Sequence, residues 1–207
     1  MDRKAHWQSV YETRSENEVS WFQDRPEKTL DLIARSGLAK DDWIIDVGGG
    51  ASNLVDHLLE RGYLHIAVLD IAQTALARSR ARLGPRAWDV EWIIADITQW
   101  RAPRRFDLWH DRAVFHFLTD PADRDAYAAT MAAAIKPGGH AIVATFAADG
   151  PEKCSGLPVC RYSAERLATA FAPSFRLVEE LREDHVTPGG AIQKFQYGRF
   201  VRNAAVG

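Results

Sequence analysis

The sequence has few cysteines and no long uncharged apolar run. Its 207 residues include only Cys154 and Cys160, too few for a disulfide framework or a paired zinc site. No apolar stretch approaches the roughly 18 residues that a membrane-spanning helix needs, and the first residues are polar. We therefore expect a soluble, cytoplasmic protein that uses no metal and has no membrane partner.

An excess of charge of one sign is also absent. The chain has 26 lysines and arginines against 28 aspartates and glutamates, a formal charge of −2, and it has no long basic block. Proteins that hold nucleic acids by their phosphates usually carry a basic patch, so this balance argues against a nucleic-acid partner. With 46% hydrophobic residues, the composition is that of an ordinary globular domain, which excludes disorder, collagen and coiled coil.

Short apolar runs alternate with longer helical stretches along most of the chain. The predicted strands cover residues 43–47, 65–70, 92–96, 106–109 and 141–146. The predicted helices cover residues 53–61, 71–83, 120–135 and 163–171. The strands are rich in branched apolar residues, as strands covered on both faces tend to be. The alternation predicts an α/β fold with a doubly wound, mostly parallel sheet.

The two ends of the chain depart from this alternation. Residues 175–181 and 193–201 have the pattern of two further strands around a Pro-Gly-Gly turn, which predicts an antiparallel hairpin at the edge of a seven-stranded sheet. Residues 1–25 carry several aromatic side chains among charges. We expect one domain over all 207 residues, with residues 1–25 as an N-terminal lid and residues 26–202 as the core.

A glycine-rich loop follows the first predicted strand. Asp46 ends that strand, and Gly48 and Gly50 follow, so that the backbone can approach a ligand closely at the carboxyl end of the sheet. Asp70 ends the next strand, near the spacing of about 20 residues expected for a carboxylate that binds ribose hydroxyls. Asp96 ends the third. Any one of these features is also typical of a tight turn or a helix cap, but together they indicate a ligand that contains adenosine.

A dinucleotide-dependent oxidoreductase is the main alternative. Its Gly-x-Gly-x-x-Gly fingerprint fits Gly48 and Gly50, but Asn53 occupies the third glycine position. The closing antiparallel hairpin is also foreign to a simple dinucleotide fold. An NAD(P)-binding oxidoreductase stays open as an alternative, as does a non-catalytic protein that binds an adenosine ligand.

Residues 26–202 resemble the class I S-adenosylmethionine-dependent methyltransferases. The resemblance rests on the acidic-x-Gly-x-Gly loop, the acidic ends of the next two strands and the closing hairpin. It implies S-adenosyl-L-methionine as cofactor and transfer of its methyl group as activity. It further implies that Asp46, Gly48 and Gly50 lie against the methionine part of the cofactor, with Ser52 where the family often has another glycine.

The same resemblance implies how the adenosine part is held. Asp70 would bind the ribose hydroxyls, and Ile71 would lie beside the adenine. Asp96 would bind the adenine amino group, and the amide of Ile97 would serve the ring.

The segment after the fourth predicted strand faces the sulfonium and the acceptor in this family. Here it holds His110, Asp111 and His116, which we take as candidate catalytic residues, with His110 also near the cofactor. An imidazole that titrates near neutral pH can take a proton from an acceptor. For the two histidines, a buried and satisfied ring is the alternative. For Asp111, the alternatives are a cap of the short helix that follows and a hydrogen bond to the methionine ammonium group of the cofactor. The segment lacks the Asn-Pro-Pro-Tyr motif of enzymes that methylate nucleic-acid bases.

Residues 10–14 and 19–22 are similar to the segment that precedes the core in lysine methyltransferases of elongation factor 1-alpha. Trp21 in this segment is a candidate cofactor contact, because a ring face attracts a cation such as a sulfonium. Trp21 and Phe22 can equally pack as a hydrophobic staple for a helix that we expect after Pro26. The methyl acceptor therefore stays open between a protein lysine and a small-molecule nucleophile.

Overall fold

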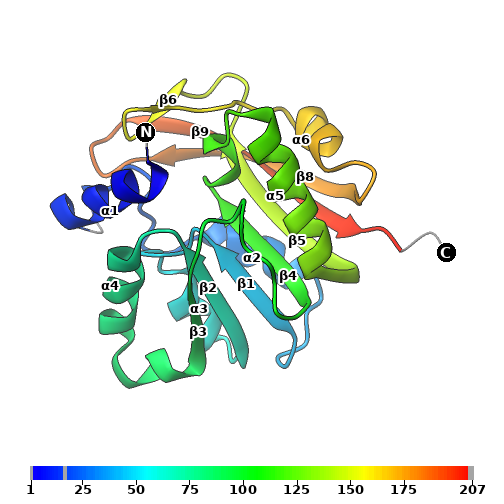
Figure 1. Cartoon of the computed structure of the whole chain (residues 1–207), viewed down its shortest axis with the longest axis horizontal. Coiled ribbons are helices and arrows are strands. Elements are labelled where there is room, and N and C mark those ends of the chain that lie inside the picture. The colour runs from blue at the N-terminus through cyan, green and yellow to red at the C-terminus, as the bar shows by residue number, and fades with distance from the viewer. Residues whose placement is uncertain (1, 16–17, 205–207) are drawn as a thin grey trace.

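The structure, a computed structural model, describes residues 2–15 and 18–204. One sheet has the strand order β3-β2-β1-β4-β5-β9-β8 (Figure 1). Its strands are β1 Trp43–Val47, β2 His65–Asp70, β3 Val90–Ile94, β4 Phe106–Arg112, β5 Ile135–Phe146, β8 Phe175–Val186 and β9 Ile192–Arg202. The short strands β6 Lys153–Cys154 and β7 Leu157–Pro158 form a separate hairpin.

Helices cover both faces of this sheet. The α-helices are α1 Arg3–Thr13, α2 Glu27–Arg35, α3 Leu54–Glu60, α4 Gln73–Leu83, α5 Pro121–Ala134 and α6 Ala164–Phe171. Two short 3-10 helices are η2 Gly84–Asp89 and η3 Phe115–Phe117. Among the described residues, no helix combines the length and the apolar character needed to cross a bilayer.

The strand directions confirm the predicted fold. β1 pairs in parallel with β2 and β4, and the parallel pairing continues outward to β3 and β5. β9 pairs antiparallel with both β5 and β8, so the predicted hairpin closes one edge of the sheet. The carboxyl ends of β1, β2 and β4 consequently lie side by side at one end of the sheet, where ligands bind in folds of this kind.

The period of two along each strand divides the core between the two faces. Ile44 and Leu108 belong to the cluster that packs under α2, α3 and α4. Their neighbours Ile45 and Trp109 belong to the cluster under α5 and α6. Because successive side chains point to opposite faces, strands buried on both faces are continuously apolar. This explains why the sequence pattern located the central strands.

Several predicted strands have different ends in the structure. β5 begins at Ile135, six residues before its prediction, and β8 continues to Val186, five residues beyond its prediction. β4 continues three residues beyond the prediction, and Arg112 still pairs with Ala144 of β5. β3 begins at Val90 and ends at Ile94, before Asp96. The Asp96 side chain accepts hydrogen bonds from the backbone amide and the hydroxyl of Thr98, which turns the chain away from the sheet.

The N-terminal segment that was predicted as a lid contains the helix α1. The carboxylate of Asp2 caps this helix by accepting hydrogen bonds from the amides of Lys4 and Ala5. α1 packs against α4 beside the sheet (Figure 1). Residues 1, 16 and 17 of the predicted lid lie outside the described residues.

Candidate active site

A cleft in two parts lies at the carboxyl ends of the central strands. The first part encloses about 750 Å³ of empty space, including some open solvent, and the second about 560 Å³. Both values fall within the range of small-molecule and cofactor sites. Five residues line both parts and mark the place where they meet: Tyr11, Trp21, Val47, Gly48 and Arg112.

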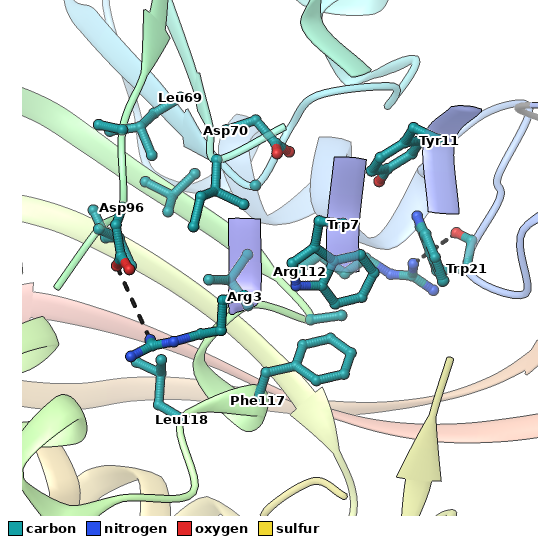
Figure 2. A pocket seen from close by; sticks show the side chains of 17 residues that line it. Arg3, Trp7, Tyr11, Trp21, Leu69, Asp70, Asp96, Arg112, Phe117 and Leu118 are labelled. Carbon is teal, nitrogen blue, oxygen red and sulfur yellow. Dashed lines mark hydrogen bonds and ion pairs between the residues drawn. The ribbon is translucent and has the colours of Figure 1, made fainter. Parts of the chain in front are cut away.

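The carboxylate of Asp70 stands in the wall of the first part (Figure 2). Its two oxygens accept hydrogen bonds from the amides of Gly50, at 3.1 Å, and Ala72, at 2.8 Å. Burial raises the pKa of Asp70 to about 6. The carboxylate is thus fixed in place by the backbone at the position where the ribose-binding residue was predicted.

The three predicted adenine contacts also line the first part. They are Ile71, Asp96 and Ile97. Arg3 of α1 reaches over this end of the cleft, with a guanidinium nitrogen 4.0 Å from the Asp96 carboxylate (Figure 2). A second guanidinium nitrogen lies 2.8 Å from the carboxylate of Asp123. Arg3 therefore connects the N-terminal helix to Asp96 in the cleft wall and to α5.

The glycine loop forms the floor between the two parts. Gly48 has a φ of +71°, and a Cβ atom there would lie 2.0 Å from the Cγ2 of Val114. A Cβ on Gly49 would lie 2.2 Å from the Oδ2 of Asp46. Both positions therefore require glycine.

Gly50 differs from the prediction in its role. It is absent from both linings and lies behind the loop, where a Cβ would come within 2.5 Å of both Ala75 and Asp70. Its amide donates to the Asp70 carboxylate. Gly49 was not predicted as a cofactor contact, but it lines the second part of the cleft where Gly50 was expected.

The second part holds the remaining predicted residues of the glycine loop, together with His110. Asp46, Ser52 and His110 all line it. The hydroxyl of Ser52 accepts a hydrogen bond from the amide of Leu54 at the start of α3. The imidazole of His110 is buried between the carboxylate of Asp46 and the hydroxyl of Thr29.

Asp111 lies outside both linings and holds the chain after β4. Its carboxylate accepts hydrogen bonds from the amides of Val114 and Phe115 and from the hydroxyl of Tyr127. Tyr127 in turn accepts one from the indole of Trp109 at 3.0 Å. Burial raises the pKa of Asp111 to about 6. The structure thus favours the helix-cap alternative for this predicted catalytic residue.

The Tyr127→Phe variant should be destabilised by about 2 kcal/mol, because it leaves a buried carboxylate and a buried indole each short of one partner. Thermal unfolding would show this as a midpoint lowered by roughly 4 to 8 °C. The matched variant Tyr63→Phe, outside this network, should change the midpoint little. Equal midpoints for Tyr127→Phe and the wild type would contradict this structural role.

His116, the third predicted catalytic residue, is fully buried and lines neither part of the cleft. Its ring packs edge-on against Phe117 and Phe146, and its Nδ1 accepts a hydrogen bond from the amide of Phe146. Burial lowers its pKa to about 3, so the ring is neutral at physiological pH. The structure places His116 in the core and away from the cleft.

Four aromatic side chains line the first part of the cleft: Trp7, Tyr11, Trp21 and Phe117. Trp7 of α1 makes edge-on contacts with Trp21, at a centroid distance of 5.7 Å, and with Phe117, at 4.8 Å (Figure 2). Tyr11 also contacts Trp21 edge-on. The sequence pointed to Trp21 alone as a contact. The four-residue spacing of Trp7 and Tyr11 was the signal that both face one way from a helix.

Arg112 joins this aromatic cover to the sheet. Its guanidinium donates to the carbonyl of Trp21 at 2.9 Å and to the hydroxyl of Tyr197 at 3.0 Å. It also lies over the ring of Phe195 and 3.5 Å from the carboxylate of Glu183. The N-terminal segment is thereby held over the cleft by a buried charge on β4.

Comparisons with known proteins agree with this arrangement. Residues 44–139, which include the glycine loop and the first acidic strand ends, match the family described as a methyltransferase domain. The match covers just under half of the chain. It begins within β1 and ends within β5, so the matched residues contribute the cleft floor and most of the carboxylates described above.

Solved methyltransferases share the fold across nearly the whole chain. The 1,6-didemethyltoxoflavin-N1-methyltransferase of Burkholderia thailandensis, solved with S-adenosylhomocysteine, aligns with a TM-score of 0.75 at 20% identity, covering 97% of this chain and 87% of that one. The N-methyltransferase NodS of Bradyrhizobium japonicum, also with S-adenosylhomocysteine, aligns with a TM-score of 0.71 at 19% identity, covering 95% and 98%.

Curated relatives match at low identity. Trans-aconitate 2-methyltransferase of Rhizobium rhizogenes is 30% identical over 101 residues, which is 48% of this chain but only 38% of the relative's length. EEF1A lysine methyltransferase 2 of Danio rerio is 21% identical over 205 residues, covering 90% of this chain and 81% of the relative.

Proposed function

We propose that the protein is an enzyme that transfers a methyl group from S-adenosyl-L-methionine to a nucleophilic acceptor. The observation that carries the proposal is a pair of adjoining pockets that share Gly48, with Asp70 and Asp96 in the lining of the first and Asp46 in the lining of the second. The methyltransferase domain match over residues 44–139 supports the same reaction.

The residues present fit this cofactor. The first part of the cleft suits the adenosine, with the fixed carboxylate of Asp70 as acceptor for ribose hydroxyls. The second part suits the amino-acid end, because the buried Oδ2 of Asp46 has no hydrogen-bond partner among the described residues. The glycine floor leaves space that a Cβ at Gly48 or Gly49 would remove.

When bound, S-adenosyl-L-methionine supplies an electrophilic methyl group on a sulfonium sulfur. The chain's own contribution is to hold, orient and shield the reactants, which can supply much of the rate in a transfer of this kind. The rings of Trp7, Trp21 and Phe117 line the cleft, exclude water and offer faces to a cation. We propose that α1 acts as the lid that the sequence suggested.

A small-molecule acceptor fits the covered cleft best, since α1 and its aromatic side chains restrict access to the place where the two parts meet. A protein lysine is the second candidate, favoured by the similarity to EEF1A lysine methyltransferase 2 over 90% of this chain. The cytoplasmic location stays a prediction.

Incubating the protein with cell extract and S-adenosylmethionine labelled in the methyl group tests this function. We expect label in the low-mass fraction, suppressed by excess S-adenosylhomocysteine; label in a protein band would instead support the lysine alternative. Cofactor binding without labelled product in any extract would contradict an enzymatic role and favour the non-catalytic alternative.

A further inference from the structure

Three buried side chains form a hydrogen-bonded chain from α2 to the glycine loop. The Nδ1 of His110 lies 2.7 Å from the Oδ1 of Asp46, and its Nε2 lies 3.1 Å from the hydroxyl oxygen of Thr29. Exposure of Thr29, Asp46 and His110 is 0%, 1% and 4%. Both ring nitrogens of His110 are therefore occupied by neighbours from two different elements.

This arrangement determines which way the Asp46 carboxylate faces. An ionised carboxylate accepts hydrogen bonds only, so His110 donates from Nδ1 to Oδ1. In the neutral ring, Nε2 then accepts from the hydroxyl of Thr29. With Oδ1 held in this way, the remaining oxygen, Oδ2, lies over Gly49, and both Asp46 and Gly49 line the second part of the cleft.

The Oδ2 oxygen is the one that is left for a ligand. It is buried without a hydrogen-bond partner among the described residues, which is costly for a charged acceptor. An ammonium group is the donor that best satisfies a carboxylate. The amino-acid end of the proposed cofactor carries such a group.

We propose that His110, braced by Thr29, is a positioning residue that orients Asp46 to bind the ammonium group of the cofactor. This inference rests on the proposed function and assigns His110 a different role from the acceptor base that the sequence suggested. A general base needs a ring nitrogen free to take a proton from the substrate. Asp46 and Thr29 occupy both nitrogens of His110.

Two ligands that differ only at the cofactor's amino-acid end make the test specific. S-adenosylhomocysteine carries the ammonium group, whereas 5′-deoxy-5′-methylthioadenosine keeps the adenosine and the sulfur but lacks that end. Titration calorimetry on the full chain should show that His110→Leu weakens S-adenosylhomocysteine about tenfold. The affinity for methylthioadenosine should change by less than about twofold.

Further variants separate positioning from loss of structure. Thr29→Val should weaken S-adenosylhomocysteine by about threefold through the loss of the brace, with methylthioadenosine again unaffected. His110→Asn, whose amide can donate in place of Nδ1, should recover most of the affinity lost in His110→Leu. Thr130→Val, a buried threonine substitution on α5, serves as the matched control and should leave both ligands unchanged.

Some results would overturn the positioning role of His110, and another would overturn the proposed function itself. Equal weakening of both ligands in His110→Leu, or no weakening of either, would overturn the positioning role. A His110→Asn variant as weak as His110→Leu would also contradict it. Wild-type protein that fails to bind S-adenosylhomocysteine would overturn the proposed function itself, and this inference with it.

Discussion

The Gly48→Ala variant should bind S-adenosylhomocysteine roughly a hundredfold more weakly than the wild type. The added Cβ would lie 2.0 Å from the Cγ2 of Val114, a distance that real contacts do not reach. The loop must shift to relieve this contact, and Gly48 lies where the two parts of the cleft meet. Calorimetric titration of the folded variant measures the loss.

Two further variants test whether the contact with Val114, and not the backbone angle of Gly48, causes the loss of affinity. Gly62→Ala places alanine at a similar backbone angle, φ +80°, but with no atom within 4 Å of the new Cβ. It should lose about 1 to 2 kcal/mol of stability through the left-handed conformation and keep its affinity. Adding Val114→Ala to Gly48→Ala removes the contacting methyl group and should restore part of the affinity. Unchanged affinity in Gly48→Ala would show that the glycine loop is not the floor of the ligand site.

Removing the carboxylate in Asp70→Ala should weaken S-adenosylhomocysteine at least about tenfold. The side chain is held by two amides and stands in the wall of the first part of the cleft, ready to accept from hydroxyl groups. Unchanged affinity in a folded Asp70→Ala protein would exclude Asp70 from the ligand site.

The pKa of Asp70 makes this contact depend on pH. Burial raises that pKa from 3.8 to about 6, so the folded protein without ligand binds this proton more tightly than the unfolded chain. Asp70 therefore favours folding below about pH 4, and that contribution is lost as pH rises through 6. Ligand affinity should change in the opposite direction, because the ionised carboxylate is the better acceptor.

We expect the wild type to bind S-adenosylhomocysteine more tightly at pH 7.5 than at pH 5. Asp70→Ala should lose most of this difference, since Asp111, whose pKa is also raised, lies outside the cleft linings. Equal slopes of affinity against pH in the two proteins would contradict the assignment of the titration to Asp70.

The sequence predicted the sheet well because its central strands are buried on both faces and therefore continuously apolar. It shortened β4, because His110, Asp111 and Arg112 are polar. Their side chains are buried in hydrogen bonds to partners from distant parts of the chain, such as Thr29 and Tyr127. Tertiary contacts of this kind leave no local pattern.

The candidate site was predictable to the extent that it lies at strand ends. Asp46, Asp70 and Asp96 follow apolar runs in a parallel sheet, so their meeting at one end follows from topology. The cover formed by Arg3 and Trp7 was not predictable, because it depends on where α1 docks. The core position of His116 depends equally on packing around η3.

The most direct test of the account is thermal unfolding with S-adenosylhomocysteine, NAD and NADP added separately, followed by tryptophan fluorescence. A ligand at about 100 times its dissociation constant stabilises a protein by roughly 2.7 kcal/mol, enough to raise the midpoint by several degrees. We predict that S-adenosylhomocysteine alone raises the midpoint. A rise with NAD or NADP alone would contradict the methyltransferase account and favour the dinucleotide alternative.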